Sequence, residues 1–167
     1  NTAVGLGTAR IEASLIAADR GDLAAALELL ETSLTELGAW QTANPDATVL
    51  EPVHARTLDR HAIWLMQSAL QTRDRATGMA LLERAIAGHT EARSLWDRLL
   101  ARSPEQAQLR GDAAQNAVSL ALPLQYTGRM VESRDSLVRG VALASALVAD
   151  FPHSQRRRSE LANARPN

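Results

Sequence analysis

The stretch GDLAAALELLETSLTELGAWQTANPDA, residues 21–47, has a counterpart in GRMVESRDSLVRGVALASALVADFPHS, residues 128–154. Few letters agree, but each stretch opens on a glycine and has a proline third from its end. Glycine permits a tight turn before a helix, and proline biases the residue before it away from helix. Each stretch is therefore predicted to be the second helix of a helical hairpin, bounded by its turn and its exit.

A third copy of this pattern lies halfway between the two, near residue 74. Each copy has a small residue, a large residue four positions later and a small residue three positions after that. Residues with this spacing share one helix face, and the small ones let a neighbouring helix approach closely. The sequence thus predicts three hairpins whose second helices nest against their partners. The three sets are Ala26, Leu30 and Ser33; Gly78, Leu82 and Ala85; and Ser133, Leu137 and Gly140.

The composition favours an all-α protein. Hydrophobic residues make up 46% of the 167 residues and aromatic residues only 3%, so the apolar content is mostly alanine, leucine and valine. These residues suit close helix packing better than a sheet. Helical periodicity runs through nearly the whole chain and strand-like alternation is nowhere sustained. The length allows one domain or one compact array of repeated units.

Local signals divide the chain into helices. In SPEQ, Ser103 is predicted as the N-cap of a helix, Pro104 as its first residue and Gln106 as the partner that completes a capping box. Gly88 is a candidate bend or break, and Pro123 a candidate kink. The predicted helices cover about 3–20, 23–43, 53–72, 75–102, 104–126 and 129–150. They form hairpins at about 3–45, 53–103 and 104–152, followed by a short capping helix at about 154–164.

Charge and cysteine content exclude several classes of protein. A net charge of −1 gives no general attraction to nucleic acid or to an anionic membrane. No run approaches the ~20 apolar residues of a membrane span. The chain has no cysteine, which excludes disulfides and thiolate metal sites and suits an oxidising compartment. We therefore favour a periplasmic over a cytoplasmic location. The start at Asn1 without methionine indicates a cut or processed form.

The sequence predicts no catalytic residues, no metal site and no cofactor. His54 and His61 lie seven residues apart on one face of the predicted third helix, with Asp59 nearby. A metal site usually needs closer spacing or a third convergent ligand, so two solvated histidines are the favoured interpretation. His89 has no obvious partner. The three tryptophans are expected as core residues or wedges between helices, and the alternative is that one lines a ligand surface.

A hairpin repeated three times, with a small–large–small signature in its second helix and a proline after it, resembles the tetratricopeptide repeat family. The usual period of that family is about 34 residues, whereas here it is about 53, which implies a long-helix variant. The family favours a small residue at the positions of Ser14, Met66 and Ala121, and Met66 departs from this pattern. The segments VADFPHSQRRRSELA and LLARSPEQAQLRGDAA are similar to repeats that follow the kinase domain in bacterial eukaryotic-like serine/threonine kinases.

The resemblance implies an α-solenoid whose first helices line a concave, partner-binding surface. It implies a non-catalytic protein- or peptide-binding domain, such as the sensor or docking module of a membrane-anchored serine/threonine kinase. The competing interpretation is that the same side chains are only the polar stripe of amphipathic helices. The candidate surface residues are Arg60, Ile63, Gln67, Gln71, Gln115, Val118, Leu122, Gln125 and Tyr126.

Two further functions stay open at this point. The first is a self-associating scaffold, which an apolar face on residues 3–18 or 154–165 would favour. The second is a small-ligand receptor or enzyme with a pocket between hairpins near Pro123 and Tyr126, which a deep closed cavity would favour. The parent protein could carry a kinase domain, but the glycine-rich loop and catalytic Asp motif of a kinase are absent from these residues.

Overall fold

In the computed structural model of this chain, residues 2–44 and 48–150 are described. Within these ranges the protein is all-α, with six α-helices, one short 3₁₀-helix and no strands, which confirms the predicted class. The predicted capping helix at about 154–164 lies outside the described residues. The elements are α1 Thr2–Asp19, α2 Leu23–Ala43, η1 Thr48–Leu50, α3 Glu51–Gln71, α4 Arg75–Arg102, α5 Ala107–Tyr126 and α6 Met130–Asp150.

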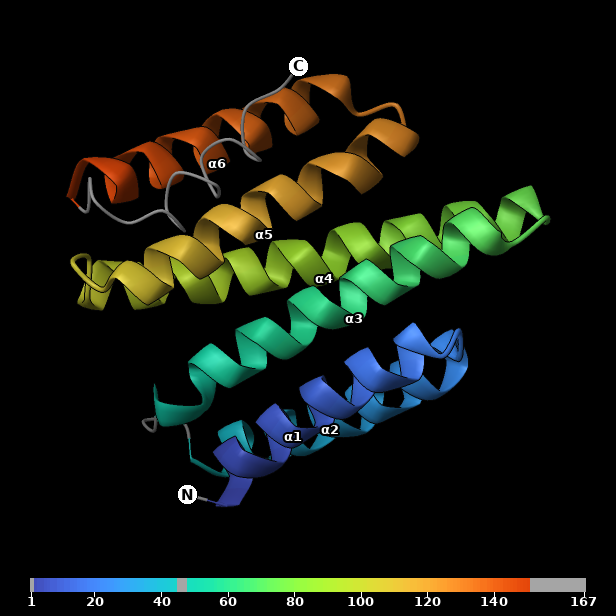
Figure 1. The fold of residues 1–167 in the computed structure, drawn as a ribbon, viewed down its shortest axis with the longest axis horizontal. Helices are drawn as coiled ribbons and strands as arrows, with labels where there is room; N and C mark the ends of the chain where they lie inside the picture. Colours follow the sequence, from blue (N-terminus) through green and yellow to red (C-terminus); the bar gives the residue numbers. More distant parts are fainter. Residues whose placement is uncertain (1, 45–47, 151–167) are drawn as a thin grey trace.

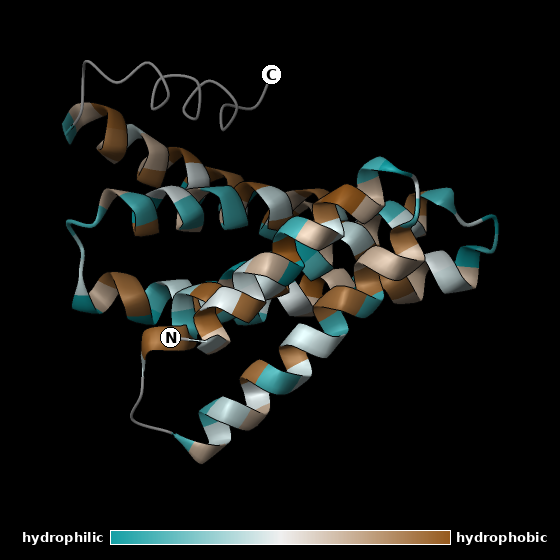
Figure 2. Cartoon of the chain, turned by 60° about the horizontal axis from the view of Figure 1, so that its bottom comes forward, coloured by the Kyte–Doolittle hydropathy of each residue, from teal (hydrophilic) through white to brown (hydrophobic). Residues whose placement is uncertain are grey.

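Each helix packs against the next one along the chain, and alternate helices also meet. In addition to these consecutive contacts, α1 contacts α3 and α3 contacts α5. The helices α1 and α2 therefore lie at one end of the stack and α6 lies at the other (Figure 1). Apolar and polar segments alternate along every helix, as expected for helices that bury one face (Figure 2).

Two of the interhelical turns use a glycine in the left-handed region. Gly21 has φ +82° and Gly128 has φ +79°. The amide after each glycine donates to the carbonyl five residues before it, at 3.0 and 2.8 Å, which closes a Schellman motif at the end of α1 and of α5. The turn between α3 and α4 has no such glycine. There Asp74 caps α4, and its Oδ2 accepts from the Thr77 amide at 2.9 Å.

The predicted capping box at the start of the fifth helix is wrong. Ser103 is instead the C-cap of α4, and its amide donates to the Leu99 carbonyl at 3.0 Å. The Gln106 amide donates to the Ser103 carbonyl at 3.2 Å, which closes a turn with Pro104 at its second position. Proline disfavours helical backbone at the residue before it, here Ser103. Proline itself suits the second position of such a turn. The helix α5 therefore begins at Ala107.

Other predicted boundaries also move. The helix α3 begins two residues before the predicted start, with Pro52 in its first turn, where proline needs no helical hydrogen-bond donor. Gly88 does not divide α4. A Cβ on Gly88 would lie 3.3 Å from the Ala62 Cβ, so this glycine lets α4 approach α3 closely. Pro123 lies inside α5, which continues to its end at Tyr126.

The small–large–small sets form much of the helix packing. All members of the first two sets are buried. In the third set Ser133 and Gly140 are buried against α5, and the Ser133 hydroxyl donates to the Ala121 carbonyl at 2.9 Å. Leu137 is only half-buried. The inner side of α6 thus repeats the pattern of α2 and α4, whereas its outer side is less covered.

Two glycines should respond to alanine with opposite signs. A Cβ on Gly140 would lie 2.9 Å from the Val118 Cγ2 and 3.3 Å from the Ala114 carbonyl oxygen. We expect Gly140→Ala to lower the free energy of unfolding by about 1–2 kcal/mol through overpacking. Gly38 has open space around it, so Gly38→Ala should raise it by about 0.5–1 kcal/mol. Urea denaturation measures both, and a change of the same sign in both would contradict the packing described.

Candidate binding groove

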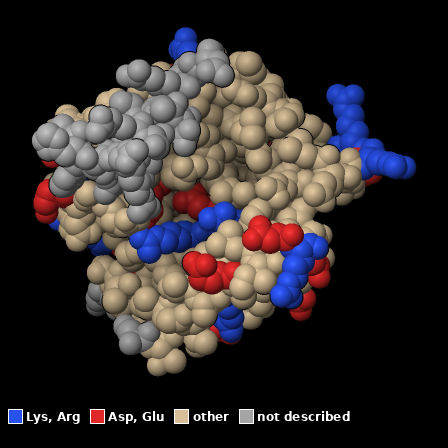
Figure 3. All heavy atoms as spheres, viewed as in Figure 1, with Lys and Arg blue, Asp and Glu red and all other residues tan. Residues whose placement is uncertain are grey.

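A polar cavity of about 420 Å³ lies on the face built by α1, α3 and α5. Its lining includes an acidic side chain from each of the three helices and two arginines from α3. Figure 3 shows side chains of both charge signs close together on this side of the molecule. The cavity thus offers both hydrogen-bond donors and acceptors to a ligand. The polar lining residues are Glu12, Arg56, Asp59, Arg60, Asp112, Gln115, Asn116 and Ser119.

A second, mostly apolar cavity of about 380 Å³ adjoins the first between α3 and α5. Ile63 and Ser119 line both cavities, so the two are halves of one groove, which we name the α3–α5 groove. One half is polar and the other is apolar. The apolar half is formed chiefly by Ile63, Met66, Val118, Ala121, Leu122 and Leu137.

An ion pair joins the two walls of the polar half. Arg56 on α3 donates to the Asp112 Oδ2 on α5, from Nε at 3.0 Å and from Nη2 at 2.7 Å. Gln108 donates to the other carboxylate oxygen of Asp112 at 3.0 Å. Both members of the pair are partly exposed, so the pair adds little stability. It bridges α3 and α5 at one end of the polar half.

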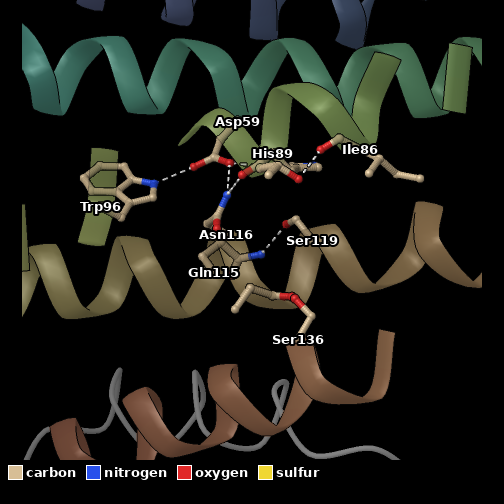
Figure 4. A network of polar contacts seen from close by, with 10 residues as sticks. Asp59, Ile86, His89, Trp96, Gln115, Asn116, Ser119 and Ser136 are labelled. Carbon is tan, nitrogen blue, oxygen red and sulfur yellow. Dashed lines mark hydrogen bonds and ion pairs between the residues drawn. The ribbon is translucent and has the colours of Figure 1, made fainter. Parts of the chain in front are cut away.

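Beneath the polar half, four side chains form a hydrogen-bonded network around Asp59 (Figure 4). The Asp59 Oδ1 lies 2.9 Å from the His89 Nδ1 and accepts from the Asn116 amide at 2.6 Å. The Trp96 indole donates to the Asp59 Oδ2 at 2.8 Å. Asp59 belongs to α3, His89 and Trp96 to α4, and Asn116 to α5. The network therefore ties three helices together beneath the groove.

The orientation of Asn116 is fixed by two acceptors. Its amide nitrogen donates to Asp59 and also to the backbone carbonyl of His89, at 2.9 Å. The Asn116 Oδ1 is buried and has no hydrogen-bond donor within the described residues. An unmade bond at a buried oxygen costs about 1–3 kcal/mol, and such groups are rare in natural proteins. The network thus fixes the amide nitrogen of Asn116 and leaves its oxygen without a protein donor within the described residues.

Arg60 forms the wall of the polar half between α1 and α3. Its guanidinium lies over the Trp64 ring, 5.5 Å from the ring centroid. Burial lowers the pKa of Arg60 below its usual value, and the charges of Asp59 and Glu12 oppose that shift. The Trp64 indole donates to the Ser14 hydroxyl of α1 at 3.4 Å. Arg60 is thus held in a fixed position at the edge of the groove.

Six of the nine residues predicted from the sequence line the α3–α5 groove. Arg60, Ile63 and Gln115 line the polar half, and Ile63 also belongs to the apolar half with Val118, Leu122 and Gln125. The other three, Gln67, Gln71 and Tyr126, line neither half.

Several groove residues were missed by the sequence prediction. Arg56 and Asp59 precede the predicted Arg60 and Ile63 on α3 at helical spacings, and Asp112 and Asn116 are four residues apart on α5. This spacing is a signal that could have indicated the four missed residues. Trp96 is fully buried, as the core interpretation of the tryptophans predicts, and it borders the polar half from α4. No comparable spacing pattern points to Glu12 on α1.

The histidines differ from their predicted setting. His61 is buried and its Nε2 lies 3.4 Å from a Glu31 carboxylate oxygen, while His54 is half-buried with its Nδ1 3.1 Å from the Gln41 amide oxygen. Burial lowers the pKa of both histidines. The prediction of two solvated histidines is therefore wrong, and so is the expectation that His89 has no partner. The described residues contain no cluster of three metal-ligating side chains.

No protein-family model, curated protein or solved structure matches this chain. None of the helices in the described ranges is long and apolar enough to cross a membrane. The role of the groove is therefore inferred from its own geometry and chemistry.

Proposed function

We propose that this chain is a non-catalytic, tetratricopeptide-like array of three hairpins that binds a peptide or protein segment in the α3–α5 groove. The order of helix contacts supports this arrangement, because α1, α3 and α5 neighbour one another while each also packs on its own partner helix. First helices that line one face are the binding geometry of such arrays. The observation that carries the proposal is the groove with a polar and an apolar half.

The shape of the groove favours a chain segment over a compact small molecule. Its halves measure about 420 and about 380 Å³ and adjoin at Ile63 and Ser119. The groove follows α3 and α5 lengthwise, since Arg56 meets Asp112 at one end and Met66 and Leu122 line the other. A segment laid along it can place several consecutive side chains in contact with the protein.

The chemistry of the two halves defines the class of ligand. Apolar side chains suit the half formed by Ile63, Val118 and Leu122, where burial favours them by about 25 cal/mol per Å². Gln115 and Arg60 in the polar half provide donors, and Glu12 provides an acceptor, for the backbone or polar side chains of the ligand. The proposed ligand is a segment with apolar residues at one end and polar residues at the other.

We further propose that this binding serves a docking or sensor role in a bacterial signalling protein such as a membrane-anchored serine/threonine kinase. The support is the resemblance of residues 99–114 and 148–162 to repeats that follow such kinase domains. In that setting, occupation of the groove would change the orientation or pairing of the attached domain. An extracytoplasmic location fits the absence of cysteine.

Substitution of one exposed leucine in the groove should weaken peptide binding strongly. Peptides selected for binding from a random displayed library would be measured against Leu122→Glu by fluorescence anisotropy. Leu122 lines the apolar half and is 40% exposed, so the charge should weaken binding at least about tenfold without unfolding the protein. Leu70→Glu is the matched control, because Leu70 is 50% exposed and lines neither half.

The control and a second variant separate the possible results. We expect Leu70→Glu to bind like the wild type, and Gln115→Ala to bind about threefold to tenfold more weakly through a lost hydrogen bond. Circular dichroism checks that each variant is folded. Selected peptides that bind Leu122→Glu and Leu70→Glu equally well, or a library that yields no binder, would count against the groove as a peptide site.

A further inference from the structure

Both ends of the helix stack leave apolar side chains uncovered within the described residues. Of the large hydrophobic residues that are exposed there, five lie on the end helices α1 and α6, with exposed fractions between 47% and 66%. A cavity of about 410 Å³ with a largely apolar lining also opens on α6. Exposed apolar surface of this kind usually marks an interaction site. The five residues are Leu6, Ile16, Met130, Val131 and Val138.

The interior of the stack shows what normally covers such faces. On α3, His61 lies beside Glu31 of α2, and Leu65 packs in one cluster with Leu27 of α2. On α5, the amide of Asn116 donates to a backbone carbonyl of α4, and Leu120 packs in one cluster with Ile86 of α4. Each interior first helix thus buries one face against the second helix of the preceding hairpin.

The first helix of the stack carries the same face without a preceding helix. Leu58, His61 and Leu65 on α3 correspond to Leu6, Ala9 and Ala13 on α1 in the repeat alignment, 52 residues earlier. The three α3 residues are buried. Leu6 and Ala9 are exposed and Ala13 is half-buried. The α1 end face, defined as Leu6, Ala9, Ala13 and Ile16, is therefore suited to a preceding second helix.

The last helix carries the reciprocal face. Glu31 and Leu34 on α2, which face α3, correspond in the repeat alignment to Val138 and Val141 on α6. Val138 is exposed and Val141 half-buried, and both line the 410 Å³ cavity together with Met130 and Leu137. We define these four residues as the α6 end face. It is suited to a following first helix.

The two end faces are complementary to each other. Inside the stack, the contact between α2 and α3 contains the polar pair Glu31 and His61. At the ends, the corresponding positions hold Val138 on α6 and Ala9 on α1, which are both apolar. At this position a contact between the end faces would be apolar where the interior contact buries a polar pair, and the nearest charge on the α6 side is that of Arg134, which is 76% exposed and lines the same cavity.

From this continuity with the interior contacts we infer that the α6 end face of one copy binds the α1 end face of a second copy, head to tail. The inference rests on the proposed repeat arrangement, and it concerns a surface that adjoins the α3–α5 groove at Leu137 but is centred on Val138, which does not line the groove. Because the two faces differ, the contact is heterologous, so assembly continues beyond the dimer into open chains or closed rings.

The test is sedimentation velocity of the whole chain across about two decades of protein concentration. We expect the wild type to exceed twice the monomer mass at the highest concentrations. Leu6→Glu and Val138→Glu each block one face. Each variant alone should therefore stay monomeric, with a dissociation constant for self-association at least about tenfold higher than that of the wild type. An equimolar mixture of the two should form dimers and stop there, because each partner supplies its intact face. Leu70→Glu, on α3, should assemble like the wild type.

Each contrary result is distinct. A wild type that stays monomeric at every concentration would overturn the inference and leave the α6 end face to the capping helix predicted at about 154–164 of the same chain, or to another partner. A Leu6→Glu variant that still dimerises like the wild type would overturn the head-to-tail geometry in favour of a symmetric α6 contact. Groove-binding peptides measured on the same variants should keep their affinity, so a failure of self-association and a failure of the groove proposal can be told apart.

Discussion

Replacement of Trp96 by alanine is expected to lower the free energy of unfolding by about 4 kcal/mol. Trp96 is fully buried in a cluster that joins α3, α4 and α5, and neighbours there include Leu95 and Leu109. The substitution removes that packing and leaves a cavity. It also removes the indole donor from Asp59. Urea denaturation followed by circular dichroism would measure the loss.

Two companion variants separate packing from hydrogen bonding at this position. Trp96→Phe keeps most of the buried volume and removes the donor, so a loss of about 1–2 kcal/mol is expected. Trp40 is half-buried on α2, and Trp40→Ala should cost less than half as much as Trp96→Ala. Equal losses for the Trp40 and Trp96 alanine variants would contradict the position of Trp96 at the centre of the core.

Substitution of Asp59 by asparagine is expected to cost about 3 kcal/mol of stability. The side chain is 17% exposed and its two oxygens accept from Trp96 and Asn116 and pair with His89. Asparagine has nearly the same shape, but one acceptor oxygen becomes an amide donor that faces another donor. The loss should appear as a lower urea midpoint, with the slope of the transition unchanged.

The matched control is the same chemical change at an exposed position. Asp135 on α6 has a side chain that is 66% exposed, and its ion pair with Arg134 is long, at 3.5 Å. Asp135→Asn should therefore change the stability by less than about 0.5 kcal/mol. If Asp59→Asn were as mild as Asp135→Asn, the network beneath the groove would not form in solution.

The helices and their faces were largely predictable because periodicity and turn residues act locally. Gly21 and Gly128 were expected at turns, and both adopt the left-handed conformation there. The motif SPEQ at residues 103–106 misled because serine followed by proline suits both a helix start and a turn. Which of the two forms depends on where α4 ends, and the motif itself does not encode that position.

The site was predictable only where one helix face determines it. Ile63 on α3 and Val118 and Leu122 on α5 were identified because each lies on a helix face that local periodicity predicts. The hydrogen bonds from His89 and Asn116 to Asp59 span 30 and 57 residues. Such contacts depend on the relative register of three helices, and the periodicity within each helix contains no information about that register. The buried network was therefore missed, although every member is a polar residue at a helical spacing.

The two halves of the groove differ in how freely they can evolve. In the polar half, Asp59, Trp96 and Asn116 also hold α3, α4 and α5 together, so a change of ligand preference there would be opposed by loss of folding. In the apolar half, Leu122 is exposed and Leu137 is half-buried. Their replacement should therefore remove little core packing and lower the free energy of unfolding only slightly. Divergence among descendants of this protein is expected to accumulate at the apolar half, which is also where a laboratory library aimed at new ligands should be randomised.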